Sequence, residues 1–319
     1  FADPEALGES GLVHGGIELG CGFAAPRVYE LSKMDGAIVV SPDLSTVRYA
    51  GAQLTPDPGI PSAETGMRHL AAHRTAQQSG AMALAISERR GTVTLYVGAH
   101  RPRVLDPVRV VLGKADSALV TLEKFAGRLK ERVRRLTVRE YEGTASLSEV
   151  AGTLETFEQT ARIAADISGY ITELGTEGGL ISLQLEQSTH WIPAQHEALL
   201  RDYVSGGVSY EEAAARLRAL EPNQLSDASL LARALGRERA ELSEDPPLNP
   251  RGHRQLSQIP RLPETVRLGL VEEFGSLDGL TRATEGDLRR VPGVGKSRAL
   301  AIARGLRRFR QLQLPAEFS

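Results

Sequence analysis

The sequence has almost no cysteine and no long apolar stretch. Its single cysteine, Cys21, excludes an internal disulfide, so a reducing, cytoplasmic setting is expected. No run approaches the roughly 18 apolar residues of a membrane span, which predicts no membrane partner. The charged, apolar and small-residue segments of a signal peptide are also missing. The chain starts at Phe1 without a methionine, and we expect some N-terminal residues to precede it.

The charge is distributed unevenly along the chain. Hydrophobic content of 41% and charged content of 24% are ordinary for a globular protein, and the formal net charge is −2. Residues 251–319 contain 13 Lys or Arg and 7 Asp or Glu, whereas the first 250 residues contain 25 and 33. A basic tail on an acidic body suggests a polyanionic partner, although a solvated, arginine-rich helical surface explains the charge equally well.

The first 112 residues mix strand and helix patterns. Short β-branched or apolar runs are bounded by turn residues, which is typical of strands. The mixture predicts an α/β domain in which helices cover a mixed sheet. The predicted strands are residues 36–40, 46–54, 81–87 and 92–98, and the predicted helices are residues 26–34 and 67–80, the second ended by Gly80.

Strand patterns are missing from the middle of the chain. Apolar residues recur at helical spacing, and Ser146 with Glu149 forms a capping-box signature. Residues 113–250 are therefore predicted to form an all-helical spine. Three prolines within residues 243–252 predict a boundary, after which residues 251–319 form a compact helical module.

The stretch VPGVGKSRALAIA, residues 291–303, looks at first like a nucleotide-binding P-loop. That motif requires a glycine five positions before Gly295, where this chain has Arg290. It also requires a preceding strand, whereas the preceding residues have the pattern of a polar helical turn. Spacing and context both argue against a P-loop.

The same stretch fits a helix, a tight glycine turn and a second helix. Free backbone N–H groups and the positive dipole end of the second helix suit a phosphate of a nucleic-acid backbone. The turn resembles the helix-hairpin-helix motif, and IPRLP (residues 259–263) resembles a more degenerate partner, so two backbones would be contacted without base reading. A protein-interaction module is the alternative. The candidate DNA contacts are Gly293, Val294 (expected to point inward), Gly295, Lys296, Ser297 and Arg298.

The first domain carries a set of residues suited to a metal–triphosphate. Asp35 precedes a predicted strand and can reach a metal, and Gly36 is expected to allow close approach of a ligand. A Pro/Gly-rich loop leads into a helix N-terminus at Gly66, where Arg68 and His69 reinforce an anion site. Each feature is weak taken singly. Ser87 and Arg90, after another strand, add a hydroxyl and a guanidinium.

Taken together, these motifs resemble the DisA family of DNA-integrity scanning diadenylate cyclases. The resemblance is collinear over nearly all 319 residues and is carried by LSKMDGAIVVS, LTPDPGIPSAETGMRH, AISERRGTVTLYVG, ITELGTEGGLISLQLE and NPRGHR. It implies that two ATP molecules are joined into cyclic di-AMP, with Mg²⁺ or Mn²⁺ and release of pyrophosphate. It also implies a bacterial, nucleoid-associated homo-octamer with face-to-face cyclase domains, which binds branched DNA such as four-way junctions and responds to DNA damage.

The resemblance also implies roles for individual residues. Residues 1–112 are the cyclase domain, residues 113–250 the spine and residues 251–319 the helix-hairpin-helix domain. Asp35 holds the metal and helps to activate a ribose 3′-hydroxyl, while Arg68 and His69 bind the triphosphate. The implied ATP contacts are Gly36, Ala37, Leu54, Gly66, Met67, Arg68, His69, Ala71, Ser87 and Arg90.

The triphosphate loop departs from the family pattern. The family has G-T-R-H-R-[TS]-A where this chain has GMRHLAA at residues 66–72, so two hydroxyls and one guanidinium are lost. Each lost charge-assisted hydrogen bond costs ~1.5–3 kcal/mol. Arg74 is a candidate to replace the missing charge.

Two hypotheses remain: an active cyclase regulated through its DNA-bound tail, or a weakened or inactive relative that holds ATP or cyclic di-AMP as a DNA-binding sensor. A DNA-repair scaffold without a nucleotide site leaves the first 112 residues unexplained.

Overall fold

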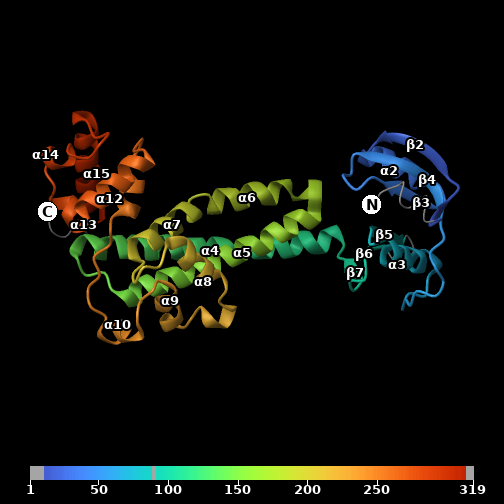
Figure 1. Ribbon diagram of the computed structural model, residues 1–319, viewed down its shortest axis with the longest axis horizontal. Coiled ribbons are helices and arrows are strands. Elements are labelled where there is room, and N and C mark those ends of the chain that lie inside the picture. Colours follow the sequence, from blue (N-terminus) through green and yellow to red (C-terminus); the bar gives the residue numbers. More distant parts are fainter. Residues whose placement is uncertain (1–10, 88–90, 314–319) are drawn as a thin grey trace. The chain divides into compact units, whose positions relative to one another are not determined.

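The computed structural model describes residues 11–87 and 91–313, leaving out the side chains of Arg239 and of residues 308–313. The described chain divides into two compact units, with the boundary between Val111 and Leu112 (Figure 1). In the described part of the chain, no helix is both long enough and apolar enough to cross a bilayer.

The first sheet of the first unit is built around one long strand. Strand β4 (Thr46–Leu54) is hydrogen-bonded to β1 (Val13–His14), β2 (Ile17–Gly22) and β3 (Ala37–Val40), always antiparallel. A short helix, α2 (Ala25–Leu31), follows β2. The pairing of β3 with β4 places the start of β3, at Ala37, beside Ala52 of β4.

The second sheet carries a helix on one face. Strands β5 (Met82–Ser87), β6 (Thr92–Val97) and β7 (Arg103–Leu105) pair in that order, all antiparallel. Helix α3 (Met67–Ser79) buries Ala72 and Ala76 against β5 and β6. As the sequence predicts, α3 ends at Gly80, whose φ of +69° lies in the left-handed region that glycine favours.

The strands and helices of this unit confirm the α/β class, but the mixed sheet needs a correction. In the described residues there are two sheets, and every strand pair is antiparallel. The short connections from β3 to β4 and from β5 to β6 account for those two pairs, because parallel neighbours need a crossover of a dozen or more residues. Strands β1, β2 and β7 were not predicted from the sequence.

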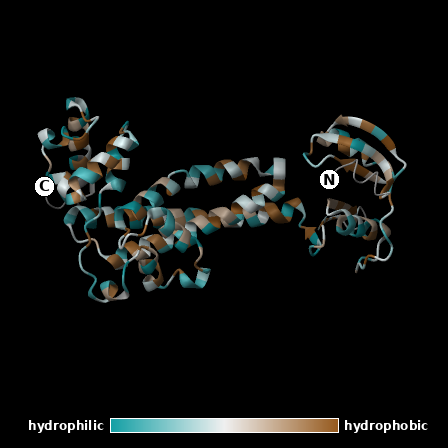
Figure 2. Ribbon diagram, viewed as in Figure 1, coloured by the Kyte–Doolittle hydropathy of each residue, from teal (hydrophilic) through white to brown (hydrophobic). Residues whose placement is uncertain are grey.

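Two long helices dominate the second unit. They are α4 (Val108–Glu142), which begins just before the boundary, and α5 (Leu147–Leu174). Both helices are amphipathic, and apolar and polar residues are interspersed along them (Figure 2). The capping box of Ser146 and Glu149 at the start of α5 is present as predicted. Shorter helices complete the bundle: α6 (Gly179–Thr189), α7 (Ile192–Tyr203), α8 (Tyr210–Arg218), α9 (Ala228–Ala234) and α10 (Arg239–Glu244).

The last helices of the second unit have a core of their own. Leu256, Leu270, Leu288 and Ile302 are fully buried in it. The helices are α11 (His253–Ser257), α12 (Glu264–Phe274), α13 (Leu277–Arg282), α14 (Glu285–Leu288) and α15 (Lys296–Gln313).

A buried polar cluster attaches these helices to the end of α4. The Arg254 and Glu140 side chains are both fully buried, and Arg254 Nη2 lies 2.8 Å from Glu140 Oε2. Tyr203 and Gln255 also donate hydrogen bonds to the Glu140 carboxylate. We call Glu140, Tyr203, Arg254 and Gln255 the polar joint. Burial raises the pKa of Glu140, and the Arg254 guanidinium opposes that rise.

A second buried carboxylate caps α11. The Asp202 carboxylate, at the end of α7, accepts the backbone N–H groups of Gly252, His253 and Arg254 at 2.7, 2.6 and 3.1 Å. These donors are the otherwise unpaired amides at the start of a helix. Asp202 thus fixes the direction in which the chain enters the C-terminal helices.

Candidate nucleotide site and candidate nucleic-acid interface

The structure joins two of the predicted site residues directly. Asp35 lies between α2 and β3, and Arg68 lies in the first turn of α3. Arg68 Nη2 donates to Asp35 Oδ1 at 2.9 Å, and the two side chains are 78% and 89% exposed. An exposed pair of this kind contributes only ~0.2–1 kcal/mol, so a ligand separates it at little cost.

Gly36 has a structural reason to be glycine. Its φ is +109°, and a Cβ added there would lie 2.6 Å from the Gly51 carbonyl carbon and 2.8 Å from the Ala52 oxygen. The close approach that Gly36 permits is therefore to the backbone of β4. Ala37 follows as the first residue of β3, paired with Ala52. These two contacts fix the position of the Asp35 backbone.

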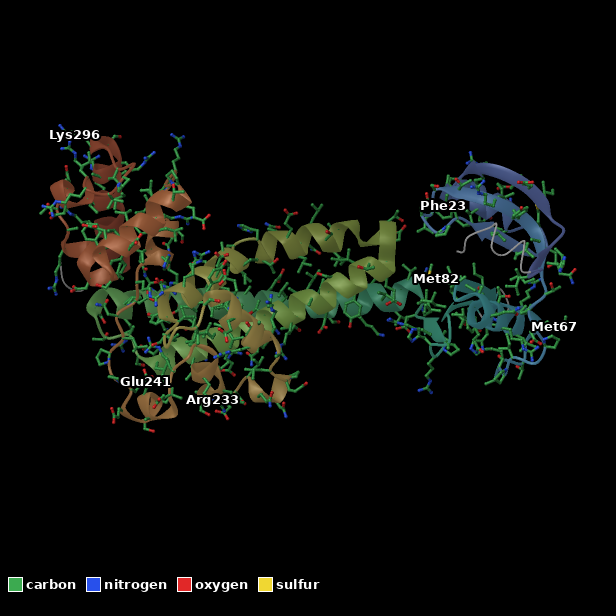
Figure 3. All side chains as sticks on the ribbon, viewed as in Figure 1. Phe23, Met67, Met82, Arg233, Glu241 and Lys296 are labelled. Atoms are coloured by element: carbon green, nitrogen blue, oxygen red, sulfur yellow. The ribbon has the colours of Figure 1, made fainter. Side chains whose placement is uncertain are left out.

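The loop before α3 ends at an open helix N-terminus. Gly66 is the N-cap, with extended backbone, and its carbonyl accepts the Leu70 amide at 2.8 Å. The amides of the residues between them have no partner within the helix, which favours an anion. Met67 is 86% exposed and points away from the core of the unit (Figure 3). Ala71 is half-buried on α3.

Side chains of α3 hold this loop in place. Arg74 Nε donates to the Ile60 carbonyl at 2.8 Å, so the residue suggested to replace the missing charge instead anchors the loop. The buried His73 lies 2.8 Å from Ser62 Oγ through its Nδ1. His69 Nδ1 lies 3.0 Å from the hydroxyl of Tyr96 on β6. Tyr96 was not predicted as a site residue, because one tyrosine in an alternating strand gives no signal beyond burial.

The remaining predicted ATP contacts are spread over both sheets. Leu54 ends β4 in the first sheet, and Ser87 ends β5 in the second, so strand pairing does not bring these two together. Arg90 lies outside the described residues.

A divalent cation fits this site only together with a substrate. Among the described residues, no three His, Cys, Asp or Glu side chains are grouped to hold a metal ion. Mg²⁺ is commonly held by one or two carboxylates together with substrate phosphates, and the exposed Asp35 carboxylate fits that arrangement.

The turn before α15 presents backbone amides, as its sequence suggests. Val294 is 5% exposed and packs in the C-terminal core, as expected. Gly293 has a φ of +83°. The first bond of α15 runs from the Ala299 amide to the Gly295 carbonyl, at 2.9 Å, so the preceding amides lie at a free helix end. We call residues 291–295 the second hairpin.

The side chains beside the second hairpin differ in direction. Lys296 and Ser297 are exposed, and Lys296 lies at the outer end of these helices (Figure 3). Arg298 instead donates a hydrogen bond to the Gly293 carbonyl, and so braces the turn.

The turn between α11 and α12, residues 259–263, repeats this geometry with different chemistry. We call it the first hairpin. Arg261 has a φ of +59°, as Gly293 has +83° two residues into the second hairpin. Ile259 is buried at the position of Val291. Pro263 and Glu264, however, stand where the second hairpin has Gly295 and Lys296, so an amide donor and a cation are lost.

Two models of known protein families match this chain and define the class of protein. Residues 2–101 match a family model described as DisA bacterial checkpoint controller nucleotide-binding, and residues 105–243 match the model of the DisA linker region. In chain order, the matches are to a nucleotide-binding region followed by a linker region. It belongs to the DisA family.

Curated relatives cover almost the whole chain. A DNA integrity scanning protein DisA from Carboxydothermus hydrogenoformans is 41% identical over 302 residues, covering 94% of this chain and 86% of the relative. The protein of the same name from Symbiobacterium thermophilum is 42% identical over 309 residues, covering 96% and 86%. That from Clostridium beijerinckii is 40% identical over 300 residues, covering 94% and 84%.

Proposed function

We propose that this protein is a diadenylate cyclase whose C-terminal helices bind DNA. The carrying observation is the contact between Asp35 and Arg68, which brings a carboxylate and a guanidinium together at the open N-terminus of α3 in a domain of a nucleotide-binding family. The proposed parts are residues 1–112 for synthesis, residues 113–250 as spine and residues 251–319, a helix-hairpin-helix domain, for DNA. A bacterial, nucleoid-associated location follows from that function.

The proposed reaction joins two ATP molecules into cyclic di-AMP. The 3′-hydroxyl of each ribose attacks the α-phosphorus of the other ATP, and pyrophosphate leaves. Arg68 and His69, with the free amides of α3, bind the triphosphate and neutralise its charge. Asp35 would hold a Mg²⁺ or Mn²⁺ ion, which supplies further charge neutralisation when bound. Because each site holds one ATP, two copies of the chain must face each other, in an octamer by analogy with the family.

A binding role without catalysis is the second candidate. It is favoured by Met67, which is 86% exposed and offers no hydroxyl at the helix N-terminus, and by Leu70 and Ala71, which replace a guanidinium and a hydroxyl of the family pattern. Such a protein would hold ATP or cyclic di-AMP and act as a DNA-binding sensor.

The experiment that separates the candidates is incubation with ATP and Mg²⁺ or Mn²⁺, followed by chromatography. Cyclic di-AMP that disappears in Asp35→Asn, but persists in the matched exposed-carboxylate control Glu30→Gln, supports the cyclase. ATP binding without product selects the sensor, and the absence of both binding and product overturns both candidates.

For DNA, the affinities for a four-way junction and a linear duplex are compared at one stated salt concentration. Equal affinities contradict a preference for branched DNA.

A further inference from the structure

Helix α15 carries positive charge with no negative charge to balance it. Its 18 residues include six Lys or Arg and no Asp or Glu. One side of the helix is fixed by the C-terminal core, in which Ala299 and Ile302 are fully buried. Lys296, Arg304 and Arg307 are exposed. We call these three the α15 cation row, because positions i, i+8 and i+11 lie along one side of an α-helix.

Exposed arginines on two other helices of this unit are neutralised within one helical turn. Arg134 lies 3.1 Å from Glu131, and Arg282 lies 2.9 Å from Asp278. The members of the cation row form no ion pair with another described side chain. Two of them are arginines three positions apart, so like charges are neighbours on the helix surface, which destabilises a helix. A bound polyanion would remove that cost, whereas solvent alone does not.

The cation row extends from the second hairpin to the level of the first. Lys296 follows the second hairpin directly. Gly305 packs so closely on Ile259 of the first hairpin that a Cβ there would lie 3.1 Å from Ile259 Cγ1. Arg304 and Arg307 lie within one turn of this contact. At 1.5 Å per residue the row is about 16 Å long, which matches about five phosphates of one DNA strand at roughly 3.4 Å each.

We propose that the α15 cation row binds the backbone of duplex DNA, and that Arg304 and Arg307 replace the phosphate contact that the first hairpin has lost. That hairpin has Pro263, without an N–H, and the anion Glu264 where the second hairpin has a glycine and a lysine. The planar guanidinium fork of arginine suits phosphate oxygens. The inference rests on the proposed function for the DNA, and it adds a contact that lies outside both hairpins.

The test combines Arg304→Ala with Arg307→Ala in the full chain and titrates it with one short DNA duplex at several salt concentrations. Loss of two phosphate contacts should weaken binding and make the slope of log K against log salt shallower by about 2. Because both side chains are exposed, the variant should unfold at the same temperature as the parent protein. Arg304→Lys with Arg307→Lys keeps both charges and should keep most of the slope.

The matched control is Arg134→Ala with Arg282→Ala, which removes two exposed charges that are already paired. It should change the slope far less than the α15 variant, and equal changes in the two overturn the inference. If Lys296→Glu weakens binding while the α15 variant binds like the parent protein, the DNA proposal stands and the role of Arg304 and Arg307 is refuted. A parent protein that binds no duplex overturns the DNA proposal itself.

Discussion

At the scale of single residues, Asp35 and Arg68 neutralise each other's charge at 2.9 Å. The carboxylate that is proposed to hold the cation therefore competes with the triphosphate for Arg68. Asp35→Asn should free Arg68 and bind metal-free ATP more tightly, by up to about fivefold, because an exposed pair is worth ~0.2–1 kcal/mol. Calorimetry with ATP in excess chelator measures this. Glu30→Gln, in an exposed pair with Lys33, should leave the affinity as it was, and weaker binding by Asp35→Asn would contradict the competition.

His253 gives a second residue-scale prediction, on pH. Burial, followed by the charges of Arg201, Arg251 and Arg267, lowers the pKa of His253 from 6.5 to about 4. Between these values the unfolded chain binds a proton that the folded chain does not, so His253 lowers stability as pH falls from about 6.5 to about 4. His253→Gln should lose less stability than the parent between pH 7 and pH 5, measured by urea unfolding. The exposed His190→Gln should follow the parent, and identical pH slopes for all three proteins would refute the effect.

Local signals predicted some residues well and others not at all. Gly80 as the end of α3, Ser146 as a cap and Val294 as a buried residue follow from the immediate neighbours in the chain, and all three are confirmed. The roles of Tyr96 and Arg254 depend on partners far away in the sequence, His69 and Glu140, so nothing in their own segments reveals them.

At the scale of elements, the predictability of a segment depends on how much of its pattern is apolar. Strands β3 to β6 have β-branched or apolar runs and were predicted. Strand β2 reads IELGCG, with two glycines, and its residues are mostly exposed, so no alternation marks it. Its pairing comes from β4, which offers an edge to it. A strand that is stabilised mainly by hydrogen bonds to its neighbour's backbone has no clear pattern of apolar side chains of its own.

The two hairpins predict unequal DNA binding. Pro263 has no N–H and Glu264 is an anion at the start of α12, so the first hairpin should contribute nothing to phosphate binding. Pro263→Gly with Glu264→Lys should raise DNA affinity and steepen the slope of log K against log salt by about 1, whereas Lys296→Glu should reduce both. Salt-dependent titration with duplex DNA measures the slopes.

The control for this prediction lies on the same helix. Glu272→Lys makes the same charge change at an exposed position of α12 away from the hairpin. Its effect on the salt slope should be smaller than that of the hairpin variant. Equal slopes for the two variants would show that general charge, rather than the hairpin, controls binding. If both hairpins contribute equally to DNA binding in the parent protein, the prediction of unequal hairpins is wrong and two backbone contacts are expected.

At the scale of the whole molecule, the α4 helix carries the attachment of the C-terminal helices within the second unit. It runs without a break from Val108, three residues after β7, to Glu142. Near its end, Glu140 receives hydrogen bonds from Arg254, Gln255 and Tyr203. The sequence predicted the long helix, but not that buried charges would connect it to the helices that follow residue 250. The C-terminal helices are thus fixed to α4 rather than tethered by a free linker.

The polar joint therefore predicts a large loss of stability from one carboxylate. Glu140→Ala leaves the buried Arg254 charge unpaired and should lower the free energy of unfolding of the second unit by ~3–5 kcal/mol. Glu131→Ala, on the same helix, removes a solvent-exposed partner of Arg134 and Arg135 and should cost far less than Glu140→Ala. Replacing both Glu140 and Arg254 by Met should recover part of the loss, because the unpaired guanidinium is removed while the buried Asp202 carboxylate keeps its three backbone N–H donors. Urea unfolding of the three variants measures these differences. If Glu140→Ala costs no more than Glu131→Ala, the joint does not hold the C-terminal helices to α4.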